Sequence, residues 1–142
     1  MRIIDNSIDF KNKKVLLRTD FDVSVEGNKI VEEFRIKKQK ETIDFLLDKG
    51  ASILMVAHIS AIESFEPILS QLEKILGYEI NFLKDIQDRN LANLNLLDNT
   101  RIWPGEEEND DNFAKQLSEG FDFYVNNAFA VCHRNHASVA GI

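Results

Sequence analysis

The chain has 142 residues, of which 44% are hydrophobic and 29% charged, and this length and composition predict one domain over residues 1–142. Its short apolar runs and the acidic Asp5 near its start argue against a membrane-spanning helix and a signal peptide, so we expect a cytoplasmic protein. The net charge of −7 argues against nucleic acid or a membrane as a partner, and the single cysteine excludes an intramolecular disulfide framework.

Strand-like and helix-like segments alternate along the chain. The predicted strands cover residues 15–17, 51–57, 78–83, 94–97 and 121–125, and the predicted helices cover residues 33–49, 67–77 and 109–119. The strands are continuous apolar runs without alternation, which is typical of parallel strands that are covered on both faces. We therefore predict an α/β fold of three layers, α/β/α, with an open, mainly parallel sheet of at least five strands.

Two details of these elements are also predicted. The apolar face of the first helix is expected to consist of Phe34, Ile36, Ile43, Leu46 and Leu47. The three consecutive glutamates at residues 106–108 are expected to form a solvated acidic turn before the last helix.

Basic side chains are concentrated after the predicted strands. Arg18, Arg101, Arg134 and all three histidines fall at or just beyond the strand ends, and Arg35 opens the first helix. The carboxyl ends of parallel strands meet at one edge of the sheet, where such folds bind their ligands. Because guanidinium groups suit two-pronged recognition of phosphate or carboxylate, the sequence predicts a small anionic ligand at this edge.

Several of these residues have alternative interpretations. A lone arginine on a loop is commonly a solvated charge or part of a surface ion pair. Cys132 beside His133 could be a thiol nucleophile, although a buried cysteine is the commoner outcome. Asp20 and Asp22 could form a general acid/base pair, but we favour a role in orienting the arginines.

No cofactor is predicted for this chain alone. His133 and His136 are three residues apart, but no third ligand stands within reach in the sequence, so a metal site is not expected. Neither G-x-G-x-x-G nor G-x-x-x-x-G-K-[ST] occurs, and the chain has only six glycines. By motif, it therefore has no nucleotide site of its own.

Four segments, in order, resemble signatures of the phosphoglycerate kinases. VLLRTDFDV at residues 15–23 resembles L-R-x-D-F-N-V-P, and FRI at residues 34–36 resembles T-R-I. LDNTRIWPGEE at residues 97–107 resembles E-N-x-R-F-x-P-G-E-E, and YVNNAFAVCHRNHAS at residues 124–138 resembles Y-V-N-D-A-F-G-x-x-H-R-x-H-A-S. The similarity runs in register from about residue 13 to residue 142, so the chain resembles the amino-terminal domain of this family.

The resemblance implies an activity and a division of labour. The family transfers a phosphoryl group between ATP and the carboxylate of 3-phosphoglycerate, with magnesium, and forms 1,3-bisphosphoglycerate. Its amino-terminal domain holds the phosphoglycerate, and its carboxy-terminal domain holds the nucleotide. The nucleotide-binding domain is absent from these 142 residues, so we expect no turnover by the chain alone and a separate nucleotide-binding domain as a partner.

By position, the resemblance also implies roles for particular residues. Arg35 takes the place of the arginine that balances charge on the transferred phosphoryl group, which is a catalytic role. The positions that match the family's substrate-binding residues are Arg18, Asp20, Phe21, Asp22, Arg35, His58, Arg101, His133, Arg134 and His136.

The sequence departs from the family pattern within this patch. Asp22 stands where the family has asparagine, and Ala61 stands where H-L-G-R-P has arginine. A lost charge-assisted phosphate contact costs about 1.5–3 kcal/mol, and the added carboxylate repels an anion, so binding is expected to weaken by roughly 10²–10³-fold. These departures keep open a catalytically inactive relative that serves as a binding module, or a gene fragment. An unrelated flavodoxin-like binding domain is the third alternative.

Overall fold

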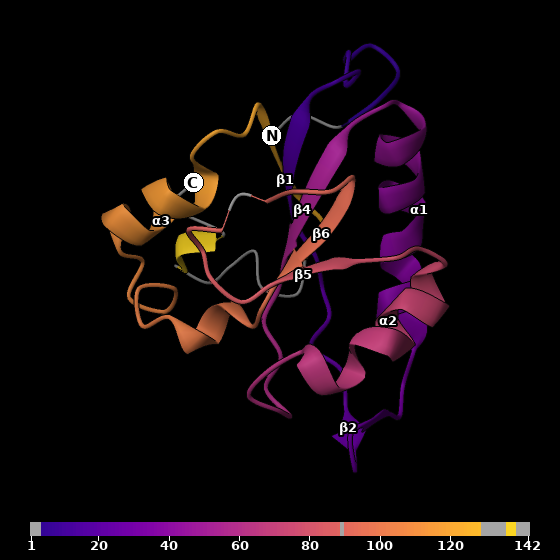
Figure 1. Ribbon diagram of the computed structural model, residues 1–142, viewed down its shortest axis with the longest axis vertical. Helices are drawn as coiled ribbons and strands as arrows, with labels where there is room; N and C mark the ends of the chain where they lie inside the picture. The colour runs from indigo at the N-terminus through magenta and orange to yellow at the C-terminus, as the bar shows by residue number, and fades with distance from the viewer. Residues whose placement is uncertain (1–3, 89, 129–135, 139–142) are drawn as a thin grey trace.

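A sheet of five parallel strands forms the centre of the computed structural model, which describes residues 4–88, 90–128 and 136–138 (Figure 1). The strand order across the sheet is β5-β6-β4-β1-β7. In chain order, the strands are β1 (Lys14–Arg18), β4 (Ser52–Val56), β5 (Asn81–Leu83), β6 (Leu94–Leu97) and β7 (Phe123–Asn126). All neighbouring pairs are parallel, so the carboxyl ends of all five strands lie along one edge.

The two central strands are buried on both faces. In β1, Val15 and Leu17 face one hydrophobic core while Leu16 faces the other. Leu16 is in register with Leu54 of β4, and Leu17 with Met55. This arrangement explains why the strands read as continuous apolar runs, because neither face meets water.

Helices cover both faces of the sheet, which confirms the predicted three-layer α/β fold. Figure 1 shows α1 (Phe34–Asp48) and α2 (Leu69–Leu76) on one side and α3 (Asp111–Ser118) on the other. Two short 3₁₀ turns, η1 (Glu66–Ile68) and η2 (Thr100–Ile102), complete the connections that precede the second and third helices. No helix within the described ranges has the length and apolar character needed to cross a membrane.

The ends of two helices follow from local sequence. Gly77 follows α2 in the left-handed conformation, with φ of 79°, which glycine adopts without steric penalty. Asp110 caps the start of α3, because its carboxylate accepts a hydrogen bond of 2.9 Å from the N–H of Phe113.

A small hairpin was not predicted from the sequence. Strands β2 (Val25–Glu26) and β3 (Lys29–Ile30) pair antiparallel through Gly27 and Asn28, which both have positive φ. Gln71 of α2 holds the hairpin by accepting from the N–H of Ile30 at 2.8 Å and donating to the carbonyl of Asn28 at 2.8 Å. This type of two-residue turn requires positive φ at both positions, which glycine and asparagine tolerate best.

Two details of the sequence prediction were wrong. Phe34 is 63% exposed instead of contributing to the apolar face of α1, because it is the first residue of the helix, and Lys38 lies 4.9 Å from its ring centre. Glu106 is only 1% exposed instead of solvated, because it is hydrogen-bonded to the backbone and hydroxyl of Ser138. Its neighbours in the acidic turn, Glu107 and Glu108, are exposed as expected.

Candidate functional site

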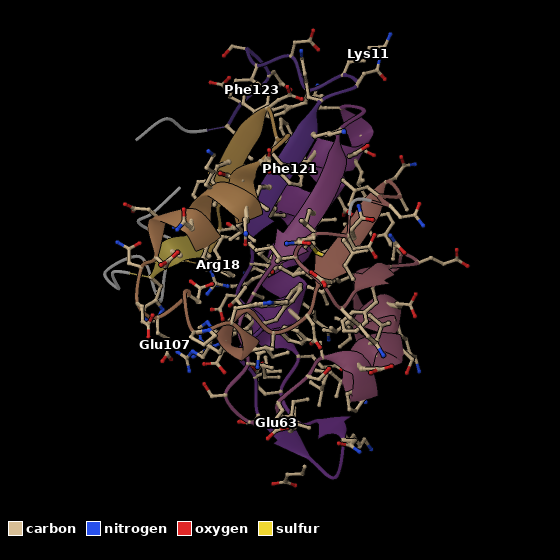
Figure 2. The ribbon with its side chains drawn as sticks, turned by 60° about the vertical axis from the view of Figure 1, so that its left-hand side comes forward. Lys11, Arg18, Glu63, Glu107, Phe121 and Phe123 are labelled. Atoms are coloured by element: carbon tan, nitrogen blue, oxygen red, sulfur yellow. The ribbon has the colours of Figure 1, made fainter. Side chains whose placement is uncertain are left out.

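Three arginines and one histidine gather at the carboxyl edge of the sheet. Figure 2 shows Lys11 and Phe123, near the starts of β1 and β7, at one end of the molecule, and Glu63 and Glu107 toward the other end. Arg18, the last residue of β1, lies between them. The site therefore starts at the end of β1 and continues into the loops that follow β4 and β6.

Arg18 lies beneath the surface of this edge and is only 1% exposed. Its Nη1 donates to the carbonyl oxygens of Thr19 at 3.1 Å and Val56 at 3.2 Å, and its Nη2 donates to Nδ1 of His58 at 2.8 Å. A guanidinium group only donates hydrogen bonds, so Nδ1 of His58 must be the acceptor, and the ring proton is on Nε2. In this geometry, Arg18 positions His58 and is shielded from solvent.

His58 in turn contacts Asp22. Its Nε2 lies 3.2 Å from Oδ2 of Asp22 and donates to it. Burial, together with the positive charges of Arg18 and Arg101, lowers the pKa of His58 to about 4. His58 is thus neutral at pH 7, which agrees with the assignment of its proton to Nε2. It therefore interacts with Asp22 through a hydrogen bond and not as a positive charge.

Asp22 is the centre of the network. Its Oδ1 accepts from the N–H of Ser60 at 2.8 Å, and its Oδ2 lies 3.4 Å from the Ser60 hydroxyl. Burial alone would raise the pKa of Asp22, but hydrogen bonds from Ser60 and the interaction with His58 outweigh it and leave this pKa lowered. Asp22 is therefore ionised at neutral pH.

Two further arginines reach the same place from other elements. Arg35 of α1 donates from Nη1 to the main-chain carbonyl of Asp22 at 3.0 Å and lies 3.8 Å from the carboxylate of Asp20. Arg101 of η2 donates from Nη1 to the hydroxyl of Ser60 at 3.1 Å, and its Nε lies 3.3 Å from Glu107. Three arginines from three segments thus meet in one network.

The loop after β4 is held in place from the end of β6. Asp98 accepts from the hydroxyl of Ser64 at 2.8 Å and from the N–H of Phe65 at 2.9 Å. Asn99 accepts from the N–H of Ile59 at 3.2 Å and donates to the carbonyl of Ile59 at 2.9 Å. Both side chains are buried, so they fix the position of Ser60 relative to Arg101.

An open hollow borders the network. Its volume is about 440 Å³, and its lining includes Ser60, Glu63, Asn99 and Arg101. A wider hollow of about 710 Å³ lies at the opposite edge of the sheet, where β6 begins, and it contains no arginine or histidine. The smaller hollow is the one that adjoins the clustered charges, and we take it as part of the candidate site.

The remaining predicted site residues have different surroundings. Phe21 is fully buried, and its ring packs edge to face on Phe65 with centres 6.3 Å apart, so it anchors the segment between Asp20 and Asp22 in the core. His136 is half-buried and precedes residues 137–138, which hydrogen bonds attach to Glu106. His133 and Arg134, as well as Cys132, lie outside the described residues.

Sequence reasoning missed Ser60, Asp98, Asn99 and the burial of Glu106. Ser60 lies two residues after His58, in the loop that follows β4, and that position is the signal that could have found it. Asp98 and Asn99 stand inside a recognised motif at the end of β6, and that position is the signal that could have found them. For the part of the chain that the structure describes, no group of three His, Cys, Asp or Glu side chains is arranged to hold a metal ion.

Comparisons with known proteins identify what the chain resembles. The family model for phosphoglycerate kinase matches residues 4–142. A phosphoglycerate kinase of Borrelia garinii is 37% identical over 94% of this chain and 38% of its own length. One from Geotalea uraniireducens is 37% identical over 100% of this chain and 40% of its own length. The chain therefore spans about two-fifths of the length of the curated relatives it matches.

Solved structures agree with the sequence comparison. The phosphoglycerate kinase of Coxiella burnetii superposes with a TM-score of 0.85 at 29% identity, covering 94% of this chain and 37% of that one. The phosphoglycerate kinase of Pyrococcus horikoshii gives a TM-score of 0.84 at 27% identity, covering 95% of this chain and 38% of that one. Fold and sequence thus point to the same family.

Proposed function

This chain belongs to the phosphoglycerate kinase family, and from that premise we propose that its site binds 3-phosphoglycerate or 1,3-bisphosphoglycerate. The chain is then the substrate-holding part of an enzyme that transfers a phosphoryl group between ATP and 3-phosphoglycerate. ATP and magnesium bind to a separate nucleotide-binding domain in this proposal, so the chain has no turnover by itself. We place this function in the cytoplasm, in one domain over residues 1–142, without a nucleic-acid or membrane partner.

The observation that carries the proposal is the convergence of arginines. Arg18, Arg35 and Arg101 come from the end of β1, the start of α1 and the turn after β6, and all three connect to Asp22 or its hydrogen-bonding partners His58 and Ser60. A substrate with a carboxylate and a phosphate needs several donors within a few ångströms of one another. Positions that are far apart in the sequence provide them here at one edge of the sheet.

We assign to Arg35 the role of stabilising negative charge on the transferred phosphoryl group. In the forward transfer, a carboxylate oxygen of 3-phosphoglycerate bonds to the γ-phosphorus of ATP while the bond from this phosphorus to the β-phosphate oxygen breaks and ADP leaves. Negative charge spreads over the oxygens of the transferred group, and a guanidinium near it lowers the barrier. The Arg35 side chain is 48% exposed, against 24% for Arg101, so it is the more accessible of the two.

Isothermal titration with 3-phosphoglycerate tests the binding proposal. Arg35→Ala is expected to weaken binding by about 10–100-fold, because a charge-assisted hydrogen bond contributes about 1.5–3 kcal/mol. Lys11→Ala is the control, since Lys11 is an exposed cation at the opposite end of the molecule (Figure 2). Equal affinities for the two variants would contradict the proposal, as would absence of heat at millimolar ligand from both the unmodified chain and variants that lack the Asp22 carboxylate.

A reconstitution experiment tests the catalytic part. The nucleotide-binding domain of an active family member is added in trans, and ADP release is measured with 3-phosphoglycerate and Mg-ATP. We expect turnover that Arg35→Ala reduces. If 3-phosphoglycerate binds but no turnover appears, the second candidate function stands: a catalytically inactive relative that acts as a binding module, which Asp22 and Ala61 favour.

A further inference from the structure

We propose that the carboxylate of Asp22 occupies the anion-binding donors of this site, competes with the anionic ligand and so lowers the affinity of the site for it. This inference rests on the proposed function, because it concerns the affinity of the same site for 3-phosphoglycerate. In the folded chain, the carboxylate of Asp22 is an anion that already lies within the site.

The first argument is the set of donors around this carboxylate. Asp22 accepts from the backbone N–H of Ser60 at 2.8 Å and from Nε2 of His58 at 3.2 Å, with the Ser60 hydroxyl at 3.4 Å. A backbone N–H, a hydroxyl and a ring N–H directed at one point are what an incoming carboxylate or phosphate would use. Ser60 is exposed, so a ligand in solution could reach these donors if Asp22 released them.

The second argument is that the arginines are also engaged by this part of the chain. Arg101 donates to the Ser60 hydroxyl, and Arg35 donates to the main-chain carbonyl of Asp22. Arg18 is buried behind His58 and connects to Asp22 only through this ring. The Asp22 segment therefore engages all three guanidinium groups, directly or through one intermediate side chain.

The third argument is the balance of charge. In the described part of the site, the three arginines are matched by the carboxylates of Asp20, Asp22 and Glu107, and His58 is neutral. A ligand with both a carboxylate and a phosphate thus meets no surplus of positive charge here. The Asp22 side chain is 29% exposed, so its charge is close enough to solvent to repel such a ligand directly.

The experiment compares 3-phosphoglycerate binding by the full chain with binding by Asp22→Asn and Asp22→Ala. Asp22→Asn removes the charge but leaves an amide, which still accepts from the Ser60 N–H and also adds an N–H₂ donor. Asp22→Ala removes the carboxylate and adds no donor. The comparison therefore distinguishes the effect of released donors from the effect of a new amide donor. Asp48→Asn is the matched control, because Asp48 is an exposed carboxylate at the far end of α1 and its loss changes the net charge equally.

We expect both Asp22 variants to bind 3-phosphoglycerate at least about tenfold more tightly than the unmodified chain, with Asp48→Asn unchanged. In the unmodified chain, the amide signal of Ser60 in a ¹H–¹⁵N spectrum should shift on saturation, because the ligand takes over its N–H from Asp22. Circular dichroism establishes that each variant is folded before titration.

Three results would overturn the inference. Equal affinity in all four proteins would remove it and leave the proposed function intact. Tighter binding by Asp22→Asn but not by Asp22→Ala would assign the effect to a new amide donor instead of released donors. Absence of binding in every protein, both Asp22 variants included, would overturn the proposed function and this inference with it.

Discussion

His58 shows how one buried ring connects the site to the stability of the fold. It accepts from Arg18 at Nδ1 and donates to Asp22 from Nε2, and the contact with Arg18 requires the neutral ring because a protonated Nδ1 cannot accept. Its pKa falls from an ordinary 6.5 to about 4 on folding. Above pH 6.5 the ring is neutral in the folded and the unfolded chain, so this contribution to stability is fully present. Below pH 6.5 the unfolded chain binds a proton that the folded chain does not bind, and stability is lost.

We therefore predict that the free energy of unfolding falls by about 2 kcal/mol between pH 7 and pH 5 through His58 alone. In His58→Gln, this part of the pH dependence should disappear, because glutamine does not titrate. Urea denaturation of both proteins at the two pH values measures the difference. The lowered pKa of Asp22 also makes acid destabilising, but mainly below pH 5. A variant with the same pH dependence as the unmodified chain would show that folding does not lower the pKa of His58.

The exposed Ala61 gives a second prediction at the level of a single residue. Ala61 follows Ser60 directly and stands where the family pattern has arginine. Ala61→Arg should tighten 3-phosphoglycerate binding by about 10–100-fold, because it adds a charged donor beside the network. The matched control is Ala92→Arg, an exposed alanine at the opposite edge of the sheet. If both substitutions tighten 3-phosphoglycerate binding equally, the effect comes from the added positive charge at long range and not from a contact at position 61.

At the scale of elements, the site depends on a loop that a neighbouring strand holds in place. Asn99, just after β6, donates to the carbonyls of Ile59 at 2.9 Å and Glu63 at 3.1 Å and accepts from the Ile59 N–H. We predict that Asn99→Ala lowers the free energy of unfolding by about 2–3 kcal/mol, since buried backbone groups lose their partners. The exposed Asn93→Ala should change it by no more than about 0.5 kcal/mol.

Thermal denaturation of the two asparagine variants measures this difference, and titration with 3-phosphoglycerate adds a second readout. Asn99→Ala should also weaken binding, because Ser60 would no longer be fixed beside Arg101. If Asn99→Ala is destabilised but binds as the unmodified chain does, the loop does not need this support to form the site.

Most elements follow from the sequence because each has a local cause. The strands are apolar runs that are buried on two sides, and Gly77 ends its helix with positive φ. The hairpin at Gly27 and Asn28 was missed because two-residue strands carry no periodicity, although the turn residues themselves were a signal. The burial of Glu106 was missed because it depends on Ser138, which is distant in the sequence.

For the site, strand order explains what the sequence could indicate. Parallel strands bring Arg18 and the residues after β4 and β6 to one edge of the sheet independently of the loop conformations. The convergence of these residues could therefore be predicted from the sequence. The position of Asp22 between them was not, because the loop that contains Ser60 takes its conformation from hydrogen bonds with Asp98 and Asn99. The ligand-contact roles of these residues remain predictions.

At the scale of the whole molecule, the sheet separates two hydrophobic cores that share their central strands. Leu16 and Leu17 are consecutive residues of β1, yet one packs toward α3 and the other toward α1. If β1 leaves the sheet when one core unfolds, the other core loses its β1 side chains and becomes exposed to water. This coupling predicts that the described residues unfold in one cooperative step, as expected for one domain.

A substitution in one core and a probe in the other test this coupling. Leu46 is fully buried in the core on the α1 side, whereas Trp103, the only tryptophan, packs near Phe113 in the core on the α3 side. Leu46→Ala should lower the free energy of unfolding by about 2–5 kcal/mol. The denaturation midpoints from Trp103 fluorescence and far-ultraviolet circular dichroism should then shift together. A fluorescence transition that stays in place while the circular dichroism transition moves would mean that the two layers unfold independently.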